Sequence, residues 1–256
     1  MRVAVCVKHA VDETELRIDQ SGTPLVEGSP SKMSSFDKSA VEEAVRMRAA
    51  RGGEVTIFTV GSPDAKRTIK EALAMGADKG VHILAELGTV DTLGTARLLA
   101  AAIKMAGGFD MVLCAEGSSD TYTGQVPPML AELLALPFVG YARKIEFKDH
   151  VVDIEQSLEE SVTSVECALP LVVSVVSEIN EPRYPTLIQI MQASKKPLMD
   201  VPRDTLGPAG FSGGNVGVVS MSGKPMNRKH IMIEGTPDEA AKKLLDALAS
   251  EGVIPK

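Results

Sequence analysis

The stretch RVAVCVK occupies residues 2–8 and is a valine-rich apolar run close to the N-terminus. Such a continuous run is typical of a strand that is buried on both faces of a parallel sheet. Two further runs of this kind follow, EVTIFTV at residues 54–60 and MVLCA at residues 111–115. We therefore expect a sheet whose central strands are covered by helices on both faces.

Helical patterns separate these strands. Apolar residues fall on one side of residues 37–50, and Gly52 ends that pattern. Ser62 and Pro63 begin a second helix, since serine caps helix N-termini and proline suits the first turn. Residues 91–106 repeat the pattern. The alternation predicts an α/β fold with a doubly wound, mainly parallel sheet, the architecture of adenine-nucleotide hydrolases.

The pattern changes in the second half of the chain. Short alternating stretches flank the polar turn Lys148–Asp149 and predict a β-hairpin insertion, and residues 171–176 form another buried strand. Residues 198–234 are rich in glycine and proline with little periodicity, so we expect an extended arm there. We therefore divide the chain into an α/β domain at residues 1–197 and a C-terminal region at residues 198–256.

A well-marked helix closes the C-terminal region. Thr236 stands at the N-cap position, Pro237 follows it, and Glu239 completes a capping box. A long stretch without secondary structure is uncommon in a compact domain unless it binds something. We therefore expect a clasping arm that binds something rather than a second core.

Composition limits the possible functions. The net charge of -7 argues against a nucleic-acid-binding protein, which would usually carry a basic face. No apolar run approaches the roughly 20 residues that a membrane-spanning helix needs, and the N-terminus does not have the pattern of a secretory signal. The cysteines are isolated and form no CxxC pair, which indicates buried or half-buried thiols in a reducing cytoplasm. We expect a cytoplasmic protein.

No self-sufficient catalytic or metal-binding set is evident in the sequence. His9, His82, His150 and His230 are scattered, and we expect them at the surface or at helix caps. Ser118 and Ser119 do not sit in a GxSxG motif, and the motifs GxGxxG and GxxxxGK[ST] are missing, so neither a serine hydrolase nor the usual nucleotide fingerprints are indicated. We expect no catalytic residue and no metal ligand in this chain.

Adjacent acidic residues have an ordinary explanation. Glu42 and Glu43 lie in a predicted helix that also carries Arg46 and Arg48. Opposite charges at such spacings commonly pair on the surface of a helix. We therefore expect both carboxylates on a solvated face.

The loop AEGSSDTYTGQ, at residues 115–125, follows the third strand and precedes a helical pattern. Ligands of open α/β sheets bind at the carboxyl ends of the strands, where residues 8–15 and 60–64 form the corresponding loops. A helix N-terminus offers free N–H groups and a partial positive charge to an anion. The loop is therefore a candidate phosphate cradle, while an ordinary capped loop also explains its residues.

The segment SEINEPRYPTLIQIMQASKKP, at residues 177–197, is too apolar for an ordinary surface helix. Leu187, Ile188, Ile190 and Met191 cover more than the single stripe that one core needs. We expect one subset to pack on the sheet and the other to be offered to a partner protein. The two lysines that close the segment are expected at the C-terminus of its own helix, where cations are favourable.

Four stretches of the sequence resemble the beta subunit of electron transfer flavoproteins. They are VEEAVRMRA (41–49), TIKEALAMGADKGVHI (68–83), TGQVPPMLAELLALP (123–137) and NEPRYPTLIQIMQASKKP (180–197). The resemblance implies a heterodimer with an alpha subunit, an FAD held mostly by alpha, and a second nucleotide held by beta. It also implies that the C-terminal region clasps the alpha subunit and that residues 177–197 dock partner dehydrogenases, many of them acyl-CoA dehydrogenases.

The resemblance also implies where these molecules bind. The second nucleotide is expected at Cys6, Ser34, Ser35, Phe36, Asp37, Val60, Ala115, Gly117, Ser118, Ser119, Asp120, Tyr122, Thr123, Gly124 and Gln125, with its phosphates at Thr123–Gln125. Phe36 corresponds to an aromatic residue near the alpha-subunit flavin, or else is an ordinary core phenylalanine. The implied contacts with a partner dehydrogenase are Ile179, Arg183, Tyr184, Leu187, Ile188 and Met191.

The nucleotide loop departs from the family pattern. Family members usually have Asn-Pro where this chain has Ser34–Ser35, and here Glu116 replaces a basic residue and Tyr122 an acid. The loop has the shorter form that is typical of electron-bifurcating members, in which the second nucleotide is an FAD that receives hydride from NADH. The longer form accompanies an AMP with a structural role. We therefore favour FAD as the second nucleotide and keep AMP as the alternative.

The resemblance thus indicates an electron-carrier subunit rather than a self-sufficient enzyme, with NADH oxidation if a second FAD is bound. A hypothesis of another class is a stand-alone ATP-binding or ATP-hydrolysing α/β enzyme, because universal-stress proteins and synthetases use the same sheet architecture. That class lacks support from the sequence, since no catalytic lysine, histidine or metal-binding acid is evident.

Overall fold

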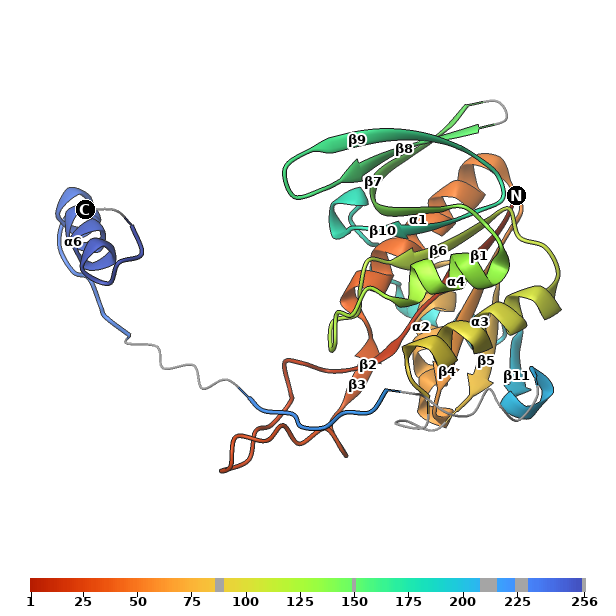
Figure 1. Ribbon diagram of the computed structural model, residues 1–256, viewed down its shortest axis with the longest axis horizontal. Helices are drawn as coiled ribbons and strands as arrows, with labels where there is room; N and C mark the ends of the chain where they lie inside the picture. The colour runs from red at the N-terminus through yellow and green to blue at the C-terminus, as the bar shows by residue number, and fades with distance from the viewer. Residues whose placement is uncertain (86–89, 149–150, 208–215, 224–229, 255–256) are drawn as a thin grey trace.

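The computed structural model describes residues 1–85, 90–148, 151–207, 216–223 and 230–254. Within these ranges, a nine-stranded sheet has the strand order β11-β5-β4-β1-β6-β10-β7-β8-β9 (Figure 1). Its strands are β1 (Arg2–Cys6), β4 (Glu54–Gly61), β5 (Lys79–Leu84), β6 (Met111–Ala115), β7 (Phe138–Lys148), β8 (Val151–Ser157), β9 (Val162–Ala168), β10 (Leu171–Val175) and β11 (Leu198–Pro202).

The strands from β11 to β7 in this order all run parallel, and only β8 and β9 join in antiparallel pairs. Helices α1 and α2 contribute to the apolar cluster on one face of the sheet, and α3 and α4 contribute to the cluster on the other. The predicted doubly wound, mainly parallel sheet is therefore confirmed.

The described helices match the predicted pattern closely. They are α1 (Ser35–Arg51), α2 (Lys66–Met75), α3 (Thr92–Ala106), α4 (Val126–Leu134), α5 (Leu187–Ala193) and α6 (Pro237–Ser250), with short 3₁₀ turns η1 (Pro63–Ala65), η2 (Ser177–Ile179) and η3 (Arg203–Thr205). A small antiparallel pair, β2 (His9–Val11) and β3 (Ser31–Met33), stands apart from the main sheet. None of these helices is long and apolar enough to cross a membrane.

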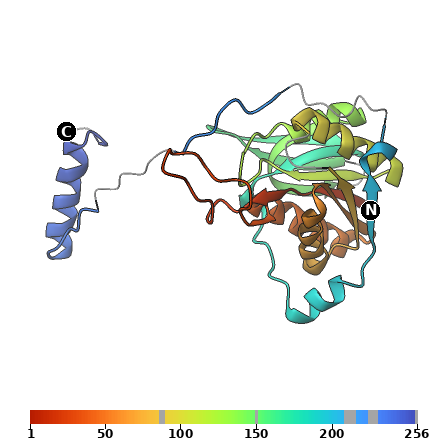
Figure 2. The same cartoon turned by 90° about the horizontal axis from the view of Figure 1, so that it is seen from below.

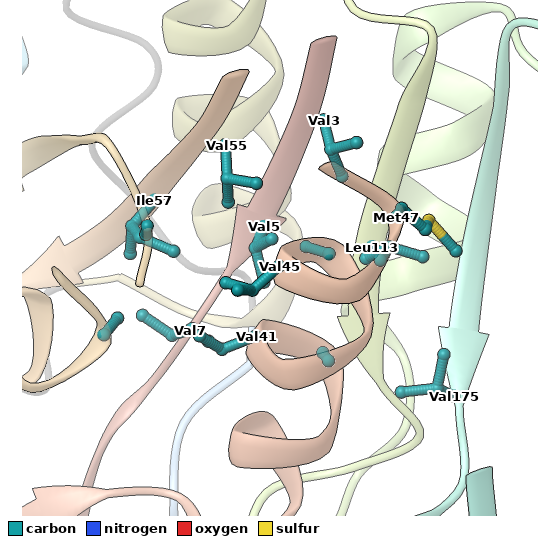
Figure 3. Close-up of a cluster of buried hydrophobic side chains, with 14 of the residues drawn as sticks. Val3, Val5, Val7, Val41, Val45, Met47, Val55, Ile57, Leu113 and Val175 are labelled. Carbon is teal, nitrogen blue, oxygen red and sulfur yellow. The ribbon is translucent and has the colours of Figure 1, made fainter. Parts of the chain in front are cut away.

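Strand β1 is buried on both faces, as its unbroken apolar run predicts. Val3 and Val5 point toward α1, where Val41 and Val45 lie in the same buried cluster (Figure 3). Ala4 belongs to the cluster on the opposite face. The alternation follows from the pleat, because successive side chains of a strand point to opposite faces. Burying both faces fixes β1 at the centre of the sheet and fixes the place where its carboxyl end emerges.

The predicted hairpin is part of a three-stranded meander. β7 and β8 form the hairpin around residues 149–150, which lie outside the described ranges, and β8 then pairs along its whole length with β9. β9 has the sequence VTSVECA, and its side chains are mostly exposed. An edge strand with so little apolar surface gives a weak alternation signal, which is why the sequence alone did not reveal it.

The sheet also continues past the predicted domain boundary at residue 197. β11 pairs in parallel with β5 and forms the other edge of the sheet. Val201 is its buried side chain, while Met199 and Asp200 are exposed. Residues 198–202 therefore pack with the α/β domain, as does Leu206, which is buried in the apolar cluster of α3 and α4.

Beyond Leu206, the described parts of the C-terminal region lie outside the core of the domain. Gly223 donates a backbone hydrogen bond of 2.6 Å to Gly22 O, which joins residues 216–223 to the long loop between β2 and β3. α6 has the predicted Thr236–Glu239 capping box and lies apart from the sheet in both views (Figures 1 and 2). Residues 208–215 and 224–229 of the predicted arm lie outside the described ranges.

Candidate functional site

The strand order places a topological switch point, which we call the crevice, between the loops that follow β1 and β6. From β1 the chain passes through α1 to β4 on one side, whereas β6 lies on the other side of β1. The loops after β1 and β6 therefore diverge, and ligands of doubly wound sheets bind at such a switch point. The loop at residues 115–125 follows β6, as the sequence predicts, so it borders this crevice.

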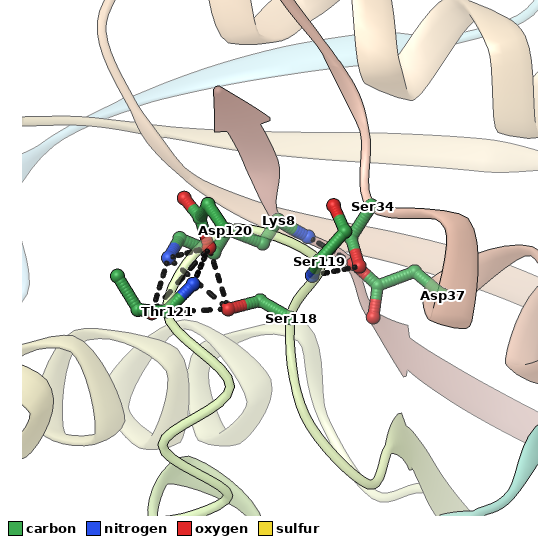
Figure 4. A network of polar contacts seen from close by, with 7 residues as sticks. All are labelled: Lys8, Ser34, Asp37, Ser118, Ser119, Asp120 and Thr121. Carbon is green, nitrogen blue, oxygen red and sulfur yellow. Dashed lines mark hydrogen bonds and ion pairs between the residues drawn. The ribbon is translucent and has the colours of Figure 1, made fainter. Parts of the chain in front are cut away.

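Lys8 joins the two loops across the crevice (Figure 4). Its Nζ donates hydrogen bonds to Asp120 Oδ1 at 2.7 Å, Thr121 Oγ1 at 3.1 Å and Ser118 Oγ at 3.3 Å. Burial alone would raise the pKa of Asp120, but the hydrogen bonds from Lys8 and Ser118 outweigh it and hold this pKa below its ordinary value. The crevice therefore has an ion pair at its base.

Sequence reasoning did not single out Lys8. Its position in the sequence could have identified it, because it is the first charged residue after the buried run that forms β1, at the carboxyl end of a central strand. A long cation at that point reaches the neighbouring loop, because both strands run parallel and end at the same edge of the sheet.

Ser34 and Asp37, at the start of α1, fasten this helix to both loops (Figure 4). Ser119 N donates to Ser34 Oγ at 3.2 Å, and Lys8 N donates to Asp37 Oδ2 at 2.6 Å. Burial raises the pKa of Asp37 to about 8, against the effect of the Lys8 hydrogen bond. The N-terminal turn of α1 thus forms a third wall of the crevice, and it carries a buried carboxyl group.

Tyr122 and Phe36 form an aromatic pair above these polar contacts. Their ring centroids are 5.3 Å apart and the rings are tilted by 53°. The Tyr122 ring lies so close to Gly117 that a Cβ there would be 2.6 Å from Tyr122 Cδ2. The pKa of the neighbouring Glu116 is raised mainly by burial. Phe36 is half-buried in this pair rather than in the main core.

The backbone of residues 122–126 is shaped to present N–H groups. Tyr122 has a φ of 45°, which is strained for a residue with a side chain, and Gly124 has a φ of 63°. Gln125 follows Gly124 in right-handed helical geometry, and such an alternation turns successive N–H groups toward one concave side. No hydrogen bond from the backbone N–H groups of Thr123–Val126 to another described residue is present.

This arrangement refines the predicted anion site. Pro127 and Pro128 occupy the first turn of α4 and have no N–H to donate, so the helix itself contributes less than its N-terminus would normally offer. The donors come from the preceding loop instead. Ser119 Oγ is also buried without a hydrogen-bond partner in the described part of the chain. These unpaired groups fit a ligand rich in hydrogen-bond acceptors, such as a nucleotide diphosphate.

The remaining predicted cofactor contacts lie around the same crevice. Cys6 and Ala115 are buried at the ends of β1 and β6, and Val60 is half-buried near the end of β4. Ser35 is exposed at the first position of α1. The pKa of the Cys114 thiol is raised by its hydrogen bond with Cys6 and by burial, so this thiol is protonated and unreactive.

His82 lies in the core, where we had expected a surface or capping residue. Its side chain is 1% exposed. Nδ1 is 2.9 Å from Asp200 Oδ1, and Nε2 is 3.0 Å from Ser62 O. It therefore connects β5 and β11 to the loop after β4. Among the described residues, no group of histidine, cysteine and carboxylate side chains could hold a metal ion.

Residues 177–197, which we call the docking segment, cross from β10 to β11 outside the main body of the domain. Asn180 Nδ2 donates to Ser39 O and to Glu43 Oε2 of α1, both at 3.0 Å. At the other end, Lys196 Nζ donates to Leu73 O at 2.8 Å and to Ala77 O at 2.6 Å. Lys196 therefore caps the C-terminus of α2, which corrects the expectation that it stabilises its own helix.

The four large apolar side chains of α5 are all exposed. Leu187 is 73% exposed, Ile188 68%, Ile190 52% and Met191 66%, while Ala193 is the buried residue of the helix. The expectation that a subset packs on the sheet is therefore wrong. The segment projects from the body of the domain in Figure 2, where it is coloured cyan. Its helix α5 lies against α2, with Ala193 in the core cluster, and its hydrogen bonds join it to α1 and α2.

Of the other predicted partner contacts, one is exposed on the surface and two hold the docking segment against the domain. Tyr184 is 90% exposed beside α5. Ile179 packs against the core, and Arg183 forms an ion pair with Glu42 of α1. Glu42 itself is buried, so the expectation of a fully solvated acidic face on α1 is also wrong. The burial of Glu42 follows from the docking segment, which covers this part of α1.

Comparison with known proteins gives consistent results over nearly the whole chain. Residues 24–206 match the family model described as the electron transfer flavoprotein domain. The chain is 35% identical to the electron transfer flavoprotein subunit beta of Thermoanaerobacterium thermosaccharolyticum, over 99% of this chain and 100% of that protein. It is 32% identical to the acryloyl-CoA reductase electron transfer subunit gamma of Anaerotignum propionicum, with the same coverage. It is also 32% identical to the caffeyl-CoA reductase-Etf complex subunit CarD of Acetobacterium woodii, again with the same coverage.

Proposed function

Since the chain belongs to the electron transfer flavoprotein family as a protein of the beta-subunit type, we propose that it forms a heterodimer with an alpha subunit and passes electrons between flavins and partner dehydrogenases. The FAD of the alpha subunit lies at the interface of the two chains. This chain contributes positioning and electrostatics, while the flavin carries the redox chemistry.

A second nucleotide binds in the crevice between the loops after β1 and β6. The free N–H groups of Thr123–Val126 and the buried hydroxyl of Ser119 support this assignment, because they are donors without a partner at a switch point of the sheet. The backbone N–H groups bind the phosphates, and Lys8 adds a positive charge nearby. The unpaired donors are the single observation that carries the proposal.

The second nucleotide is FAD rather than AMP in this proposal. The loop between Asp120 and Thr123 has the short form, and the Tyr122 ring within it is 54% exposed. An aromatic side chain at that place offers a stacking surface to a planar ring system. When bound, a second flavin supplies the capacity to accept hydride from NADH, and the complex then performs electron bifurcation. AMP remains the alternative occupant.

The docking segment binds the partner dehydrogenase. Its exposed apolar side chains support this role, because a contiguous apolar patch on a soluble protein commonly marks a recognition surface. Two relatives are named for acryloyl-CoA and caffeyl-CoA reductases. These names favour a partner that acts on an acyl-CoA thioester. The C-terminal arm and α6 clasp the alpha subunit, and the exposed Leu244 and Leu245 of α6 support this part of the proposal.

The decisive experiment is a cofactor count on the heterodimer, made by coexpressing this chain with its alpha subunit. The released nucleotides are separated by chromatography, and flavin is quantified by absorbance. We expect two FAD per heterodimer. One FAD with one AMP would reverse the choice of nucleotide. A chain that is a stable monomer and binds no alpha-type subunit would reject the proposal, and ATP turnover by that monomer would favour the hydrolase class instead.

A further inference from the structure

Glu42 lies on α1 directly beneath the entrance of the docking segment, and its side chain is 3% exposed. Its Oε2 accepts hydrogen bonds from Arg183 N at 3.3 Å and from Arg183 Nε at 2.6 Å. Its Oε1 accepts from Arg183 Nη2 at 2.9 Å and from Arg46 Nε at 2.7 Å. One buried carboxylate is therefore bonded to both the backbone and the side chain of a single residue of the segment.

The geometry is that of a rigid contact. The two guanidinium bonds from Arg183 form a bidentate pair, which restricts orientation as well as distance. Arg46 also reaches the segment, because its Nη2 donates to Glu181 O at 3.2 Å. Burial opposes ionisation of Glu42, but the hydrogen bonds from Arg183 and Arg46 outweigh it and hold its pKa at about 2. The carboxylate is charged throughout the physiological range.

This contact helps to keep the apolar side chains of α5 exposed. An exposed segment with so many large apolar groups would lower its free energy by collapsing onto any nearby apolar surface. Between Arg183 and Lys196, Ala193 is the residue that the domain buries. The segment is fixed at its entrance by Glu42 and at its exit by the bonds of Lys196 to α2. With both ends fixed and α5 lying against α2, the large apolar side chains of α5 stay exposed.

We propose that Glu42 is a positioning residue for partner recognition: through Arg183 it holds the docking segment in its binding conformation before the partner arrives. The inference rests on the proposed docking function of this segment and goes beyond it by naming the residues that preorganise the surface. Neither Glu42 nor the Arg183 guanidinium needs to touch the partner. A preorganised segment binds with less loss of conformational entropy than one that must order itself on contact.

The local effect is tested in the heterodimer with Glu42→Gln and Arg183→Lys. Both variants remove part of the bidentate ion pair while keeping similar size. We expect faster hydrogen exchange and faster chymotrypsin cleavage at residues 184–192 than in the wild type. Arg51→Gln is the matched control, because Arg51 lies on the same helix and its guanidinium lies over the Phe147 ring of β7 instead of the segment. Unchanged hydrogen exchange at residues 184–192 in both Glu42→Gln and Arg183→Lys would overturn the proposal.

The effect on docking is tested by electron exchange with a purified acyl-CoA dehydrogenase at increasing concentration. If the variants reduce the population of the binding-competent segment to about one tenth, the apparent KM for the dehydrogenase rises about tenfold. The kcat at saturation and the nucleotide content stay at wild-type values. A general structural defect would instead lower nucleotide content or kcat, and that result would overturn a positioning role.

The two proposals fail in different ways. If the wild-type heterodimer exchanges no electrons with the dehydrogenase, the docking function is rejected. The hydrogen-exchange comparison still tests whether the Glu42–Arg183 ion pair orders the docking segment. If Glu42→Gln does not fold because the replaced side chain is buried, Arg183→Lys alone supplies the hydrogen-exchange and KM measurements. The Arg183 side chain is 41% exposed, so its replacement does not open the core.

Discussion

Lys8 Nζ lies 2.7 Å from Asp120 Oδ1, and this ion pair joins the loop after β1 to the loop after β6. The two strands are neighbours in the sheet, but their connections leave in opposite directions. The pair therefore closes the floor of the switch-point crevice at the place where the backbone leaves it open. It also holds Ser118 and Thr121 in position, because both hydroxyls bond to Lys8.

Replacing Lys8 with methionine should weaken nucleotide binding. The change keeps the length of the side chain and removes its hydrogen bonds and its charge near the phosphates. A charge-assisted hydrogen bond contributes about 1.5–3 kcal/mol, so affinity should fall about tenfold or more. The measurement is calorimetric titration of FAD and of AMP into heterodimer stripped of its nucleotides. Lys148→Met is the control, since Lys148 makes a similar 2.7 Å pair with Asp153 in the β7–β8 hairpin.

Replacing Ser119 with alanine should have opposite effects on stability and binding. Its Oγ is buried without a partner among the described residues, and such a group costs about 1–3 kcal/mol. The alanine variant should therefore raise the melting temperature of the nucleotide-stripped heterodimer and lower its affinity for nucleotide. Ser164→Ala provides the comparison, because Ser164 Oγ already donates to Asp153 and its loss should not stabilise the protein. Lower stability with unchanged affinity in Ser119→Ala would contradict the assigned role.

Asp37 should make the stability of the heterodimer depend on pH. Burial raises its pKa from 3.8 in the unfolded chain to about 8 in the folded one. Between these values the folded state keeps a proton that the unfolded state has lost, so stability falls as pH rises, by up to about 1.4 kcal/mol per pH unit. Asp37→Asn keeps an oxygen for Lys8 N and removes the ionisation.

The matching measurement is the melting temperature of both proteins from about pH 5 to pH 9. The advantage of the asparagine variant should grow with pH and level off above about pH 8. A difference that does not depend on pH would show that Asp37 is ionised in the folded protein across this range.

Much of the fold could be predicted because its signals are local. Burial of β1 and β4 can be predicted from their own apolar runs, and burial of one side of α1 and α3 from their own apolar stripes. The capping box of α6 is equally local. β9 and β11 were missed because edge strands bury few side chains, so their sequences carry little alternation.

The location of the candidate site could be predicted from the sequence, but the side-chain contacts within it could not. The loop at residues 115–125 could be found from its position after a buried strand. The roles of Lys8 and Glu42 depend on partners far along the chain, Asp120 and Arg183 respectively. No spacing rule within one helix or loop reveals such a pair. The outward direction of α5 was missed for the same reason, since it follows from anchors on two other helices.

Leu187 should contribute to docking and not to folding. Its side chain is 73% exposed on α5, so Leu187→Ala removes apolar surface from the docking segment without leaving a cavity. Truncating an interface residue of this kind commonly costs about 1–2 kcal/mol, which is an increase of about tenfold in the KM for a partner acyl-CoA dehydrogenase. Nucleotide content and melting temperature should stay unchanged. Leu158→Ala is the control, because Leu158 is 44% exposed next to β8, away from the docking segment. If Leu187→Ala instead lost nucleotide or stability while the KM stayed the same, the docking segment would be part of the structural core of the heterodimer.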